Sequence, residues 1–121
     1  MSVLTWIAVG ACGGLGAIAR FVVDTLVSER VGRAFPWGTL VVNVSGALLL
    51  GLLAGAALHG DARLLAATAT LGSYTTFSTW MLDTFRLGEA GQRGLARANV
   101  ALSLAVGLAA IELGRLLGGL L

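Results

Sequence analysis

The densest group of chemically active side chains lies between Gly72 and Trp80. This nine-residue run carries five aliphatic hydroxyls, three aromatic rings and one glycine. Hydroxyls can hydrogen-bond an anion, and the edges of aromatic rings carry positive potential. The run lies inside the uncharged stretch Leu64–Leu82, which is otherwise apolar enough for a bilayer. Polar groups at that depth must be buried in protein or line a wet path, so we expect a solvated pathway here.

We expect the helix that carries this run to be broken near Gly72–Thr76. The glycine is followed by hydroxyl residues that compete for main-chain hydrogen bonds. A broken helix leaves carbonyl oxygens that can coordinate a cation in mid-membrane. The alternative is a continuous helix whose hydroxyls bond back to their own carbonyls.

Two aromatic residues and several donors follow the expected break. Phe77 and Trp80 are three residues apart and so share a helix face, where two ring edges could hold a small anion. Ser78 and Thr79 add donors to the same turn. The alternative for the two rings is ordinary packing or lipid contact.

Other segments also carry polar side chains at membrane depth. Asn43 lies in the middle of the second uncharged stretch, and its amide could donate to a pathway or bond to a neighbouring helix. In the last apolar segment, polar and small residues recur at helical spacing and form either a buried seam or a pore wall. This stripe comprises Asn99, Ser103, Gly107, Ala110 and Gly114.

The chain lacks the groups that other chemistries need. No Asp, Glu or His lies at the centre of an apolar stretch, so a carboxylate relay for proton coupling is missing. No nucleophile–base pair is visible, and we therefore do not expect an enzyme. The single Cys12 cannot form an intramolecular disulfide. A net charge of +2 from scattered arginines does not indicate nucleic-acid binding.

Composition places these residues in an all-α membrane protein. Hydrophobic residues make up 57% of the chain and charged residues only 12%, against about 25% charged residues in soluble domains. The apolar stretches are long enough for helices that cross the hydrocarbon core. We expect a single transmembrane domain over residues 1–121, with spans at 3–23, 37–58, 62–85 and 95–118. The first span lacks the basic start of a signal peptide.

The connections should be short and the consecutive helices antiparallel. Charge and turn residues gather at 24–37, 59–61 and 86–94. The first and third connections carry more arginines than the terminal side, which predicts that they are cytoplasmic. This bias is modest, so insertion in both orientations stays open. Small residues four apart should let the helices approach closely; these pairs are Gly10/Gly14, Gly51/Gly55 and Gly114/Gly118.

Three motifs, in this order, resemble the CrcB/Fluc family of fluoride channels. They are Gly-Gly-x-Gly-Ala-x-x-Arg at 13–20, Gly-Thr-Leu-x-x-Asn-x-x-Gly at 38–46, and Thr-Thr-Phe-Ser-Thr at 75–79. The resemblance implies a passive channel that exports cytoplasmic fluoride across the bacterial plasma (inner) membrane. It also implies an antiparallel dual-topology homodimer with two pathways. A fixed orientation would instead require a heterodimer with a paralogue of opposite topology.

The resemblance also implies roles for individual residues. The main-chain carbonyls of Gly72 and Thr75 would hold a structural Na⁺ on the two-fold axis, and Arg20 and Asp83 would lie in the vestibules. The fluoride pathway would use Asn43, Phe77, Ser78, Thr79, Trp80 and Ser103. The chain departs from the family pattern at Trp80, where Phe is usual, and at Ser73, where Gly is frequent.

Two other classes of protein compete with a channel. A small four-helix, dual-topology, proton-coupled drug exporter fits the size, but it needs a glutamate in the first helix, and Met1–Ala19 has none. A structural subunit without a pathway would leave the hydroxyl cluster at 75–79 unexplained.

Overall fold

The computed structural model describes residues 1–121, and all of its regular elements are helical. Three helices are long and apolar enough to cross a membrane: α1 (Val3–Val31), α2 (Trp37–Gly55) and α6 (Arg93–Gly118). The segment between α2 and α6 is divided into shorter pieces. These are α3 (Gly60–Arg63), the π-helix η1 (Leu64–Leu71), α4 (Gly72–Tyr74) and α5 (Ser78–Glu89). The predicted all-α membrane class is confirmed.

The first helix is longer than predicted. Ser2 caps its start by accepting a hydrogen bond from the Thr5 N–H, and it ends at Gly32, which adopts a left-handed φ of 83°. The stretch from Asp24 to Val31 contains no glycine or proline, so nothing interrupts the helix there. The expected loop at 24–37 is therefore wrong in length, because only residues 32–36 connect α1 to α2.

The predicted break in the third span is present. The backbone leaves the helical conformation at Thr75, whose ψ is 158°, and helix resumes at Ser78. The break thus falls at the C-terminal end of the expected range. Before it, η1 has the wider turns of a π-helix, an element that often occurs at functional sites.

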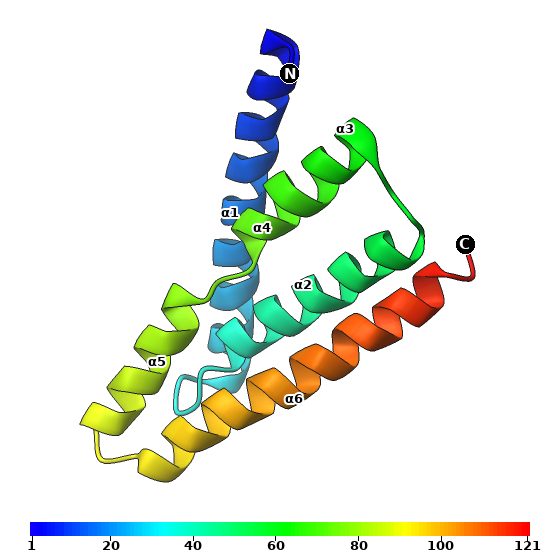
Figure 1. Cartoon of the computed structure of the whole chain (residues 1–121). Helices are drawn as coiled ribbons and strands as arrows, with labels where there is room; N and C mark the ends of the chain where they lie inside the picture. Colours follow the sequence, from blue (N-terminus) through cyan, green and yellow to red (C-terminus); the bar gives the residue numbers. More distant parts are fainter.

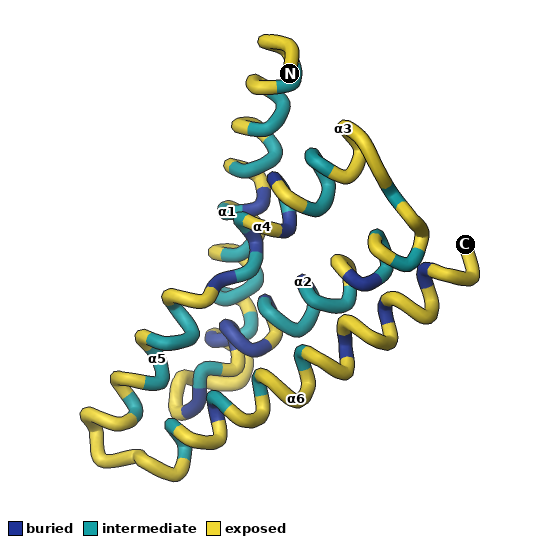
Figure 2. The backbone as a smooth tube through the Cα atoms, in the orientation of Figure 1, coloured by how far each residue is buried: buried dark blue, intermediate teal, exposed yellow.

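The packing of α2 against α6 forms the most extensive helix–helix contact in the chain. The two helices lie side by side, and the buried residues of α6 recur along one side of it (Figures 1 and 2). A Cβ added to Gly51 or Gly55 would meet the backbone of α6, and one added to Gly114 or Gly118 would meet the backbone of α2. These two predicted glycine pairs do allow close approach.

The third glycine pair is not used in the same way. A Cβ at Gly10 or Gly14 would meet nothing within 4 Å. The remaining contacts place α1 against α2, η1 and α4, and α5 against α6. Figure 1 places both termini towards one end of the molecule and the α1–α2 and α5–α6 connections at the other. This arrangement fits an even number of crossings.

Candidate functional site

The break is closed by a side chain from another helix. Asn43 of α2 donates from Nδ2 to the Thr76 carbonyl oxygen and accepts at Oδ1 from the Thr76 N–H, each over 2.8 Å. Both polar groups of the Thr76 main chain are thereby satisfied where the helix cannot satisfy them. The Asn43 amide has two N–H hydrogens, and only one of them donates to Thr76, so the other is available to a further acceptor.

The same pairing releases two carbonyl groups. In a continuous helix the Thr76 N–H would bond to the Gly72 carbonyl, and the Thr79 N–H to the Thr75 carbonyl. Here the Thr76 N–H bonds to Asn43, and the Thr79 N–H bonds to the Thr76 hydroxyl over 3.1 Å. The carbonyl oxygens of Gly72 and Thr75 therefore lose their helical donors. Such oxygens are the ligands that a hard cation prefers.

A groove of about 350 Å³ runs past the break, and we call it the break groove. It brings together five of the predicted site residues: Asn43, Gly72, Thr75, Phe77 and Trp80. The rings of Phe77 and Trp80 lie edge to face, with centroids 5.8 Å apart and an interplanar angle of 83°. Phe77 is 71% exposed. The groove of a single chain is therefore open on one side.

Polar residues form two further cavities that share Asp24, Thr39 and Thr79. The inner cavity, about 210 Å³, also contains Arg20 and Thr76 among its lining residues. The inner cavity thus reaches Thr76, whose main chain is hydrogen-bonded to Asn43.

The outer cavity, about 360 Å³, adds Asp83 together with Arg33 and Arg86. The Thr39 hydroxyl donates to Asp83 Oδ2 over 2.8 Å, which joins α2 to α5. The predicted vestibule residues Arg20 and Asp83 therefore line adjacent polar cavities that lead from the α1–α2 connection towards the break.

Three predicted pathway residues lie outside the break groove. Thr79 lines the two polar cavities instead. Ser78 begins α5, and its hydroxyl lies 3.5 Å from the Thr76 hydroxyl. The Ser103 hydroxyl on α6 is buried and has no hydrogen-bond partner within the chain.

Sequence reasoning missed the structural roles of Thr39 and Thr76. Thr39 lies four residues before Asn43, so both project from the same face of α2 towards the segment around the break. That spacing was the available signal for Thr39. Nothing local to Thr76 indicates that its main chain would pair with a residue 33 positions away.

The fold and the site together define a small multi-pass membrane protein whose polar groups converge on a helix break. The family model described as "CrcB-like protein, Camphor Resistance (CrcB)" matches residues 7–115. The chain belongs to this family.

Curated relatives cover almost the whole chain. It is 55% identical over 115 residues to fluoride-specific ion channel FluC 2 of Mycobacterium bovis, covering 95% of this chain and 91% of the relative. It is 54% identical over 119 residues to FluC 2 of Mycolicibacterium paratuberculosis, covering 98% of each. It is 42% identical over 121 residues to FluC 1 of Symbiobacterium thermophilum, covering 95% and 98%. Ion channels are transporters rather than enzymes.

Proposed function

We propose that this chain forms a passive, fluoride-selective channel that lets cytoplasmic fluoride leave the cell. The observation that carries the proposal is the near full-length match to relatives named fluoride-specific ion channels. The break groove supports it, since ring edges and amide and hydroxyl donors meet there at a helix break. No observation favours the proton-coupled exporter.

The mechanism follows from the hydration of the ion. Fluoride is small and holds water tightly, so a pathway must replace that water with several donors and positive ring edges. Asn43 can supply an N–H, and Phe77 and Trp80 can supply ring edges. Arg20 raises the potential in the inner cavity, which favours entry of an anion. An inside-negative membrane then drives exit by about 2.3 kcal/mol per 100 mV, without energy coupling.

We further propose that a second copy in antiparallel orientation covers the open side of the break groove. The exposed Phe77 and the free space beside Gly10 and Gly14 support this assembly, because they leave room for another helix. A paralogue of opposite topology could occupy the same position. The bacterial plasma membrane is the proposed location.

A structural Na⁺ fits the freed carbonyls of the break. Gly72 and Thr75 each offer a carbonyl oxygen that has lost its helical donor, and both residues line the break groove. A cation held there would supply positive charge that stabilises the interrupted backbone. A symmetric dimer would provide four such oxygens, two from each copy.

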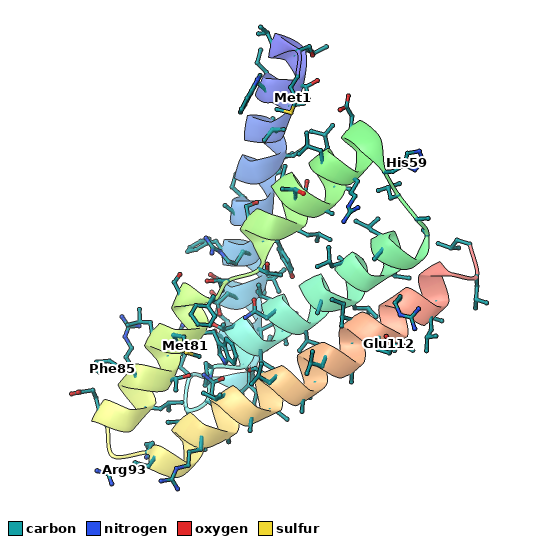
Figure 3. The ribbon with its side chains drawn as sticks, viewed as in Figure 1. Met1, His59, Met81, Phe85, Arg93 and Glu112 are labelled. Atoms are coloured by element: carbon teal, nitrogen blue, oxygen red, sulfur yellow. The ribbon has the colours of Figure 1, made fainter.

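The test is fluoride efflux from liposomes that contain the purified protein alone, with valinomycin setting the potential and chloride as the competing anion. We expect rapid efflux that chloride does not inhibit. Phe77→Ile should abolish most of it, because the ring edge at the groove is lost. Phe85→Ile is the matched control, since Phe85 is an exposed ring on the outer side of α5 (Figure 3). Equal efflux in all three proteins would contradict the proposed pathway.

A further inference from the structure

Asn99 of α6 contacts the turn of α5 that carries Trp80 in several ways. The indole Nε1–H of Trp80 donates to the main-chain carbonyl of Asn99 over 3.1 Å. The Asn99 Nδ2 donates to Thr84 Oγ1 over 2.9 Å and lies 3.4 Å from the Trp80 carbonyl oxygen. Asn99 is completely buried. Asn99 therefore contacts the side chain of Trp80, its main chain and the residue one turn further on.

The chemistry of the neighbours fixes how the Asn99 amide is oriented. The Thr84 hydroxyl donates its only hydrogen to the Trp80 carbonyl over 2.9 Å, so it presents lone pairs to Asn99. The Trp80 carbonyl is also an acceptor. Only the NH₂ group of the amide suits both, which leaves Oδ1 pointing elsewhere.

The buried Asn99 side chain leaves one polar atom without a hydrogen bond, which lowers the stability of the folded protein. The Asn99 Oδ1 is buried and has no hydrogen-bond partner in the chain. A buried polar atom without a partner is destabilising, and an apolar residue of similar shape would avoid that cost. Asn99 therefore does something at this position that packing alone does not require.

We propose that Asn99 is a positioning residue that keeps the indole N–H of Trp80 towards α6 and away from the permeating anion. Its main-chain carbonyl accepts from the indole, and its side chain holds the Trp80 turn in the position where that bond forms. The anion then meets the C–H edge of the ring, as it would at a phenylalanine. This inference rests on the proposed fluoride pathway. Conduction requires binding weak enough for release, and a free indole N–H would bind fluoride much more strongly than a ring edge does.

The first test reads the indole N–H directly by NMR of protein labelled with ¹⁵N-tryptophan. Trp80→Phe assigns the Trp80 signal, and Trp6 and Trp37 are internal references. We expect the Trp80 N–H to exchange with deuterium at least about tenfold more slowly than that of Trp6, because it is hydrogen-bonded inside the protein. Sodium fluoride should change its chemical shift only slightly, because the anion meets the C–H edge of the ring and not the N–H. A large downfield shift with fluoride, or exchange as fast as in Trp6, would overturn the proposal.

The second test separates positioning from a merely structural clamp. Asn99→Leu is made in the native chain and in the Trp80→Phe chain, and fluoride efflux and fluoride-over-chloride selectivity are measured in liposomes. Asn99→Leu keeps the main-chain carbonyl but loses the side-chain hydrogen bonds that fix the Trp80 turn beside it. In the native chain we therefore expect the indole to rotate and selectivity to fall roughly tenfold. In the Trp80→Phe chain it should stay as it was, since a phenyl ring has no N–H to release. Equal losses in both chains would show that Asn99 only joins α5 to α6.

Thr84→Val gives a milder version of the same experiment if Asn99→Leu does not fold. It removes one acceptor of the Asn99 amide and keeps the volume of the side chain. The same dependence on Trp80 is expected, and its absence would count against the proposal.

The failure of the inference and the failure of the proposed function give different results. A protein that passes no fluoride but has a slowly exchanging Trp80 N–H would refute the channel, and with it any role towards an anion. A protein that passes fluoride with a rapidly exchanging Trp80 N–H would refute the inference alone.

Discussion

The α2–α6 seam and the break before α5 solve opposite problems in the same small bundle. Along the seam, each helix satisfies its own main chain, and glycines such as Gly51 and Gly114 let the two backbones meet. At the break, the helix no longer satisfies its main chain, and Asn43 supplies the missing partners from α2. The seam depends on the absence of side-chain atoms, whereas the break depends on particular polar atoms.

This difference predicts how each region responds to mutation. Added volume should disrupt the seam, because main-chain atoms there have no room to move aside. Loss of a hydrogen-bonding group should disrupt the break, because hydrocarbon offers no water as a substitute. Three substitutions test this comparison.

The largest effect is expected for Asn43→Leu. This change leaves the N–H and the carbonyl of Thr76 without partners, and each buried unsatisfied group costs about 1–3 kcal/mol. We expect a lower thermal midpoint in detergent and loss of fluoride efflux. Asn43→Asp is the informative companion, because its ionised carboxylate keeps an acceptor for the Thr76 N–H, has no donor for the Thr76 carbonyl and adds a negative charge. If Asn43→Leu left the midpoint unchanged, the side chain would not be what closes the break.

An intermediate effect is expected for Gly114→Ala. The added methyl group would meet the α2 backbone at Leu48 and Leu52, and overpacking of this kind costs about 1–3 kcal/mol. The matched control is Gly107→Ala on the same helix, where a Cβ would meet nothing within 4 Å. Denaturant titration in detergent should show Gly114→Ala less stable and Gly107→Ala unchanged or slightly more stable. Equal stabilities would mean that the seam can open without cost.

The smallest effect is expected for Ser73→Ala, just before the break, where α4 packs against α1. Its hydroxyl has three acceptors within reach, the nearest being the Gly13 carbonyl of α1 at 2.7 Å. One hydroxyl hydrogen can serve only one of them well, and such interhelical bonds average roughly 0.6 kcal/mol in membranes. Thr68→Val, an exposed hydroxyl on η1, is the control in the same denaturant titration. A loss several times larger would show that Ser73 holds α1 against the break.

Both regions could be predicted in part from the sequence, for different reasons. The seam was visible because spacing along one helix decides which small residues share a face, as at Gly114 and Gly118. The break was also visible, because glycine and hydroxyl residues are locally unfavourable for a helix. The length of α1 was not, since charged residues after Asp24 suggested a loop although they are compatible with a helix.

The sequence by itself determined the class of protein, the order of its helices and the place where one of them breaks. These properties depend on local composition and on periodicity along the chain. Only the tertiary structure decided that Asn43 pairs with Thr76, that Thr39 binds Asp83, and that the indole of Trp80 faces Asn99. Those contacts join residues 19 to 44 positions apart. They depend on how each helix is rotated about its axis, which packing against the other helices sets.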